Sequence, residues 1–88
     1  MDRQELFEEV VETIKALDST AKPKEFRLDD TAFRAYGIDS LTLIRLAARL
    51  EDRYDIRISD ADAFAASSFQ RLVDLLLGKL MAARSDPR

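Results

Sequence analysis

The residues best suited to chemistry lie at the Asp39-Ser40 step, which follows Gly37 and precedes a stretch of helical apolar spacing. Gly37 permits a backbone turn with positive φ, and either Asp39 or Ser40 can cap the helix that begins there. Free N–H groups and the helix dipole also favour an anion at such a position. Two interpretations of Ser40 follow: a simple helix cap, or the acceptor of a negatively charged group.

The composition removes the usual ways to activate such a serine. The chain has no histidine and no cysteine, which excludes a Ser-His-Asp triad, a thiol nucleophile, a disulfide and a conventional zinc site. Asp29 and Asp30 offer paired carboxylates for acid–base or metal chemistry, but loop solvation explains them more economically. Ser40 is therefore expected to be the passive recipient of another enzyme's chemistry.

The elements that position this step are helices, so the predicted fold class is all-α. Apolar side chains recur every three or four positions over residues 2–17 and 40–54, and Glu9 is among the acidic residues that the first segment leaves to water. The connection between these helices is long and polar, and Pro23 interrupts any continuous helix through it. Phe26, Leu28 and Phe33 are expected to anchor it to the core.

Two further helices complete a predicted four-helix bundle with a short third helix. Ser59 followed by Asp62 predicts a capped helix over residues 60–65. The last helix is expected to begin at Ser67 or Ser68 and to fray at Gly78 and over the terminal residues. At 88 residues the chain has room for one domain, which we place at residues 1–82, with a flexible tail at 83–88.

The run Tyr36-Gly37-Ile38-Asp39-Ser40-Leu41, set before a helix and followed by a short helix and a last one, resembles the acyl and peptidyl carrier proteins. Their signature is Gly-x-Asp-Ser-Leu at the start of the second helix of a four-helix bundle, and the resemblance covers nearly the whole chain. It implies that Ser40 receives 4′-phosphopantetheine from coenzyme A. The thiol of that group would hold substrates as thioesters, so the protein itself would not be an enzyme.

The resemblance also implies a surface around Ser40 that is read by partner enzymes. These partners are a phosphopantetheinyl transferase, an acyl- or aminoacyl-loading enzyme, and a downstream synthase, transferase or thioesterase. Asp39 would contribute to recognition as well as capping the helix, and Phe64 is a further candidate. Leu41 and Ile44 fit an edge-of-core position equally well. The proposed partner-binding residues are Leu41, Ile44, Arg45, Ala48, Arg49 and Ala66.

Charge separates this chain from familiar fatty-acid carriers, whose second and third helices are acidic. Residues 1–32 hold five basic and nine acidic side chains, whereas residues 33–58 hold five and four. Arg45 and Arg49 are either a solvated face paired with Asp52 or a sign of altered partner choice. For the pair we favour altered partner choice, which points to a secondary-metabolite pathway of polyketide or nonribosomal peptide type. Fatty-acid synthesis and an unmodified helical interaction module are the alternatives.

The net charge of −3 argues against non-specific attraction to nucleic acid or to an anionic membrane. A helix-turn-helix DNA binder is therefore disfavoured despite the arginines of the second helix. No segment has the length of apolar sequence that a membrane span requires. The chain is expected to be a cytoplasmic monomer without a metal site.

Overall fold

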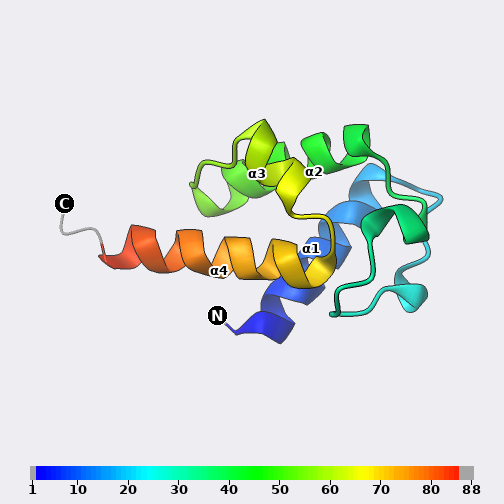
Figure 1. The fold of residues 1–88 in the computed structure, drawn as a ribbon, viewed down its shortest axis with the longest axis horizontal. Helices are drawn as coiled ribbons and strands as arrows, with labels where there is room; N and C mark the ends of the chain where they lie inside the picture. Colours follow the sequence, from blue (N-terminus) through cyan, green and yellow to red (C-terminus); the bar gives the residue numbers. More distant parts are fainter. Residues whose placement is uncertain (1, 86–88) are drawn as a thin grey trace.

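The structure is a computed structural model that describes residues 2–85. Within these residues the chain forms four α-helices and two short 3-10 helices, and Figure 1 shows them arranged as a bundle. This confirms the predicted all-α fold with a short third helix and a long first connection. In chain order the elements are α1 (Arg3–Leu17), η1 (Pro23–Glu25), η2 (Phe33–Tyr36), α2 (Ser40–Tyr54), α3 (Asp60–Ala65) and α4 (Phe69–Ser85).

Helix boundaries follow the capping chemistry of the sequence. Asp2 caps α1 through the backbone N–H of Glu5, whose side chain faces back toward the Asp2 backbone in a capping box. Ser59 and Asp62 form the same arrangement at α3, so the predicted bounds of this short helix are confirmed. The predicted span of α2, residues 40–54, is confirmed as well.

The last helix is longer than the sequence predicts. It begins at Phe69 and continues through Gly78 to Ser85. A glycine costs a helix interior about 1 kcal/mol relative to alanine, which the burial of neighbouring α4 side chains such as Leu76 offsets. Residues 83–85 of the expected tail therefore belong to α4, and residues 86–88 lie outside the described residues. The flexibility of the tail stays a prediction.

The core lies between α1, α2 and α4 and extends into the first connection. The ring of Phe69, at the start of α4, has its centroid 4.8 Å from that of Phe33 and 5.0 Å from that of Phe26. Phe26 and Phe33 are buried and Leu28 is partly buried against the core, which confirms that they anchor the connection. The buried residues of the three long helices are Leu6, Val10, Ile14, Leu46, Ala47, Leu50, Phe69, Leu72, Val73 and Leu76.

The environment of Glu9 in α1 differs from the one that the sequence predicts. Glu9 was expected to face water, but it is half-buried and accepts hydrogen bonds from the Tyr54 hydroxyl and, at 2.8 Å, from Arg53. Burial, together with this carboxylate, raises the pKa of Tyr54 to about 12, so the hydroxyl remains a donor at neutral pH. The contact joins α1 to the end of α2.

In Figure 1 the starts of α2 and α4 lie toward the end of the bundle that holds the first connection. The chain thus gathers the Asp39-Ser40 step, η2 and the residues before α4 at one end. No helix within residues 2–85 is long and apolar enough to cross a membrane.

Candidate functional site

A tight turn delivers the chain into α2. Gly37 follows η2 with φ of +78°, a conformation that side-chain-bearing residues rarely adopt. A Cβ atom built on Gly37 meets nothing within 4 Å, so the glycine is needed for the backbone angle and not for space. Ile38 then buries its side chain and donates its N–H to the Phe33 carbonyl at 3.2 Å. The turn and the buried Ile38 together place Asp39 and Ser40 at the surface.

Asp39 is the cap of α2. Its Oδ1 accepts a hydrogen bond from the Thr42 backbone N–H at 2.8 Å, and its own backbone is extended. That hydrogen bond lowers the pKa of Asp39 below its ordinary value, and the positive charge of Arg45 lowers it further. The carboxylate is therefore ionised at neutral pH. The structure assigns to Asp39 the capping role that the sequence left open between Asp39 and Ser40.

Ser40 is the first residue of α2, and it is exposed. Among the described residues none forms a hydrogen bond with its hydroxyl. The free N–H groups of the first helical turn favour an added anion at this position. Because Asp39 already caps the helix, the Ser40 hydroxyl is not needed for capping.

A pocket opens beside Ser40. It has a volume of about 430 Å³ and lies between η2, the start of α2 and the end of α3. Apolar side chains form most of its wall, with polar groups near Ser40. This mixture suits a ligand that alternates amide groups with methylene and methyl groups. The lining residues are Ala32, Phe33, Arg34, Ile38, Asp39, Ser40, Leu43, Phe64 and Ser67.

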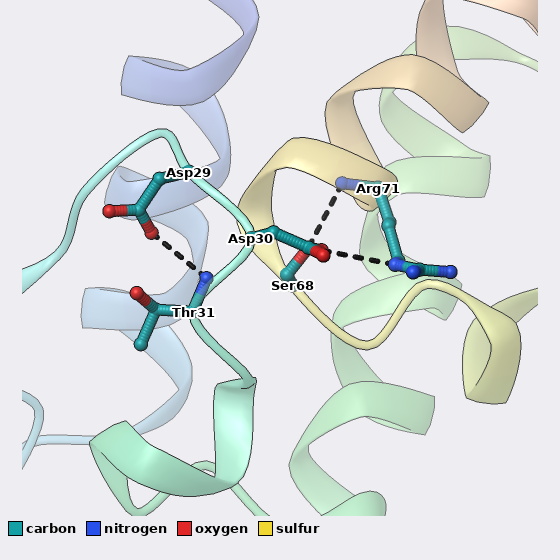
Figure 2. A network of polar contacts seen from close by, with 5 residues as sticks. All are labelled: Asp29, Asp30, Thr31, Ser68 and Arg71. Atoms are coloured by element: carbon teal, nitrogen blue, oxygen red, sulfur yellow. Dashed lines mark hydrogen bonds and ion pairs between the residues drawn. The ribbon is translucent and has the colours of Figure 1, made fainter.

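The connection that bears η2 is tied to the start of α4 by polar contacts (Figure 2). Asp30 accepts hydrogen bonds from the Ser68 hydroxyl at 2.8 Å and from Arg71 Nε at 3.0 Å. Asp29 accepts from the Thr31 backbone N–H at 3.0 Å. The interpretation of Asp29 and Asp30 as loop solvation is therefore corrected, because both carboxylates order the segment that leads to η2. The partners of the Asp30 carboxylate lie 38 and 41 residues away and could not be read from local spacing, whereas the Asp29 carboxylate has a partner two residues away.

The structure places most of the predicted partner residues on one exposed surface. Leu41 is 56% exposed and Ile44 is 37% exposed, and Ala48 on the same helix is exposed too. Arg45 and Arg49 are also exposed, and within residues 2–85 neither forms an ion pair, with Asp52 or otherwise.

Ala66 does not belong to this surface. Only 4% of it is exposed, because it follows α3 and packs into the core instead of facing Ser40. Phe64, two positions earlier and within α3, is 51% exposed and lines the pocket. Of the two candidates near the third helix, Phe64 is therefore exposed beside Ser40 and Ala66 is not.

Arg34 and Ser67 are pocket residues that the sequence did not single out. Arg34 lies in η2 and Ser67 lies between α3 and α4, 33 positions apart, and the Phe33 backbone N–H donates to the Ser67 carbonyl at 2.8 Å. That backbone contact brings the two segments together. The available sequence signal for Arg34 was a basic residue three positions before Gly37. Its place at the pocket, however, depends on the short helix η2, which the sequence did not predict.

The fold and the site define a small helical domain that presents an unbonded serine at a capped helix start, beside an open pocket. Residues 6–76 match the sequence model of the family described as "Phosphopantetheine attachment site". The chain belongs to this family, which confirms the predicted resemblance. Domains of the family carry a covalently attached 4′-phosphopantetheine.

Individual relatives agree with this assignment. The chain is 43% identical over 54 residues to the actinorhodin polyketide synthase acyl carrier protein of Streptomyces coelicolor, strain ATCC BAA-471 / A3(2) / M145. That match covers 61% of this chain and 63% of the relative, slightly less than two thirds of its length.

Among solved structures, the fold is similar to an NMR solution structure of 3-oxo-butyl-ACP, an intermediate mimic from the actinorhodin polyketide synthase of Streptomyces coelicolor. The TM-score is 0.74 at 30% identity, over 88% of this chain and 92% of the other.

Proposed function

We propose that this chain is a discrete carrier protein that is modified with 4′-phosphopantetheine on Ser40 and passes thioester-bound intermediates between the enzymes of a polyketide pathway. The observation that supports this most directly is the division of labour at the start of α2. Asp39 caps the helix through Thr42, and the exposed Ser40 hydroxyl is left without a hydrogen bond among the described residues. Family membership supplies the group that such a hydroxyl would accept.

The chain's own part in the modification is to present the hydroxyl. Ser40 Oγ would form a bond to the pantetheine-bearing phosphorus of coenzyme A, and the pyrophosphate bond to the nucleotide would break. Adenosine 3′,5′-bisphosphate leaves, and the hydroxyl proton passes to a base of the transferase, since this chain has no histidine to take it. The new phosphodiester lies at the N-terminus of α2, where free N–H groups favour its charge.

Intact-mass spectrometry tests the modification. The purified chain is incubated with coenzyme A and a broad-specificity phosphopantetheinyl transferase, and we expect a mass increase of one phosphopantetheine. Ser40→Ala should show none. Ser67→Ala is the matched control, because Ser67 is an exposed serine that lines the same pocket. An unmodified wild type would contradict the carrier function and favour the unmodified interaction module.

Once bound, the cofactor supplies a thiol that holds acyl groups and moves them between active sites. We propose polyketide cargo because the curated relative and the similar solved structure both come from a polyketide synthase. Incubation of the modified chain with malonyl-coenzyme A and a malonyl transferase, followed by intact-mass analysis, should show one malonyl group. Loading only by an adenylating enzyme with an amino acid would contradict polyketide cargo and favour a peptide pathway.

The surface formed by Leu41, Ile44, Arg45, Ala48 and Arg49, together with Phe64, is the proposed docking surface for partner enzymes. Its exposed apolar side chains and two unpaired arginines fit a partner with an apolar centre and an acidic rim. Partners whose docking surface is basic would be repelled, which distinguishes this chain from carriers with acidic second helices.

Charge reversal tests the docking surface. With a malonyl transferase whose docking face is acidic, the double variant Arg45→Glu, Arg49→Glu should raise KM about tenfold and leave kcat nearly unchanged. Arg57→Glu is the matched control, because Arg57 is exposed but lies beyond the end of α2. An equal rise in KM for the control would contradict a localised arginine contact.

A further inference from the structure

Modification of Ser40 places two negative charges on neighbouring residues. The Asp39 carboxylate caps α2 directly beside Ser40, and the capping hydrogen bond lowers its pKa further below neutral pH. A phosphodiester on Ser40 would add a second anion at the same helix start. Like charges this close repel each other, so a cation near the phosphodiester would stabilise the modified protein in addition to the helix N–H groups.

Two arginines lie around this helix start, and they have different surroundings. Arg45, further along α2, is the arginine whose charge acts on the Asp39 carboxylate. Arg34 lines the pocket together with Ser40, and it is the only basic residue among the described residues that form the pocket wall. Within residues 2–85 the Arg34 side chain has no hydrogen bond or ion pair. Arg71, by contrast, is already paired with Asp30.

The backbone of Arg34 is firmly placed although its side chain is exposed. Phe33, its neighbour in η2, is buried with 1% of its surface exposed, and the Arg34 carbonyl accepts the N–H of Gly37 at 3.1 Å. The preceding segment is held to α4 by the contacts of Asp29 and Asp30 (Figure 2). Arg34 is thus a guanidinium on a rigid support that borders the same pocket as the Ser40 hydroxyl.

We propose that Arg34 is a positioning residue that binds the phosphodiester on Ser40 and lays the pantetheine arm across the pocket toward Phe64. This inference rests on the proposed modification of Ser40. A guanidinium donates two parallel N–H groups and so suits the two non-bridging oxygens of a phosphodiester. In the unmodified chain Arg34 has no such anion to bind, so its contribution begins with the modification.

The test compares unmodified and modified protein for each variant, because a merely structural role would affect both forms alike. Arg34→Gln should leave the melting temperature of the unmodified chain nearly unchanged and lower that of the modified chain by roughly 2–4 °C at low salt. The difference should shrink as salt screens the pair. Arg34→Lys should restore part of it, and Arg57→Gln, an exposed arginine beyond the end of α2, is the matched control.

Phosphorus NMR of the modified proteins gives a second measurement that does not depend on stability. The phosphodiester resonance should shift in Arg34→Gln and not in Arg57→Gln. Contacts between the arm's methyl groups and the Phe64 ring should weaken in Arg34→Gln alone. If the wild type gains the expected mass but Arg34→Gln leaves the resonance and the melting temperature unchanged, the role of Arg34 is wrong and the carrier function stands. If the wild type gains no mass, both proposals fail.

Discussion

The starts of α2 and α4 use the same residue types in opposite ways. At α4, Ser68 is fully buried, accepts a hydrogen bond from the Arg71 backbone N–H at 3.2 Å, and donates to Asp30 at 2.8 Å. At α2, Asp39 accepts the capping hydrogen bond, and Ser40, one position later, is exposed and unbonded among the described residues.

The difference shows that a serine at a helix start is free for chemistry only when another residue caps the helix. The Ser68 hydroxyl forms structural hydrogen bonds, and the Ser59 hydroxyl likewise accepts the Asp62 N–H at the start of α3. At α2 the capping residue is Asp39, one position before Ser40, so the Ser40 hydroxyl is not needed as a cap. The Asp39 carboxylate is also the reason that we propose Arg34 as the partner of a second anion at this helix start.

The largest expected effect is a difference in the free energy of unfolding between variants of Ser68 and Ser40. Ser68→Ala removes a cap and leaves a buried hydrogen-bonding site unfilled, so it should lower the free energy of unfolding by about 1–3 kcal/mol. Ser40→Ala should change it by less than about 0.5 kcal/mol, since no contact is lost. Urea unfolding of both variants measures this.

The same pair should give the reverse order in the mass assay, where Ser68→Ala is still modified and Ser40→Ala is not. A Ser40→Ala variant as unstable as Ser68→Ala would break the comparison, because it would mean that Ser40 supports the fold.

A smaller effect is expected from the residue that caps α2. Asp39→Ala should lower the melting temperature by a few degrees, because the Thr42 N–H loses its acceptor. Asp39→Asn keeps a side-chain oxygen at the cap and should lose less. Thermal unfolding followed by circular dichroism distinguishes them. Equal losses in both variants would show that the charge of Asp39, and not its hydrogen bond, stabilises the helix start.

The smallest effect is a pH dependence at the start of α4. Hydrogen bonds from Ser68 and Arg71 lower the pKa of Asp30 in the folded chain. A lowered folded pKa means that this stabilisation is complete above the ordinary pKa of an aspartate, about 4, and is lost as pH falls through the lower folded value. The urea midpoint of the wild type should therefore fall more steeply below pH 4 than that of Asp30→Asn. Parallel curves for the two proteins would contradict this role.

Local signals predicted the fold and the central part of the site well. The spans of α2 and α3 and the cap of α3 followed from apolar spacing and from residues within three positions of one another. The turn at Gly37 was predicted for the same reason, because a positive φ is a local requirement.

The remaining features depend on residues far apart in the chain. The Tyr54 contact with Glu9 spans 45 positions and the Ser68 contact with Asp30 spans 38, so neither carboxylate could be distinguished from a solvated one. Phe64 lies within α3 and Ala66 directly follows the helix, so which of the two is exposed depends on how α3 packs against its neighbours. The charge of the docking surface was readable from the sequence, but the place of Arg34 in the pocket was not.

Two backbone contacts between the first connection and the start of α4 affect how the protein opens. The Phe33 N–H donates to the Ser67 carbonyl, and the Gln70 N–H donates to the Asp29 carbonyl at 3.1 Å. Long connections are usually the first parts of a domain to exchange their amide hydrogens with solvent, because they open alone. Here the connection can open only when the first turn of α4 opens with it. We therefore expect the segment that supports Ser40 to open as part of a cooperative unit that includes the start of a core helix.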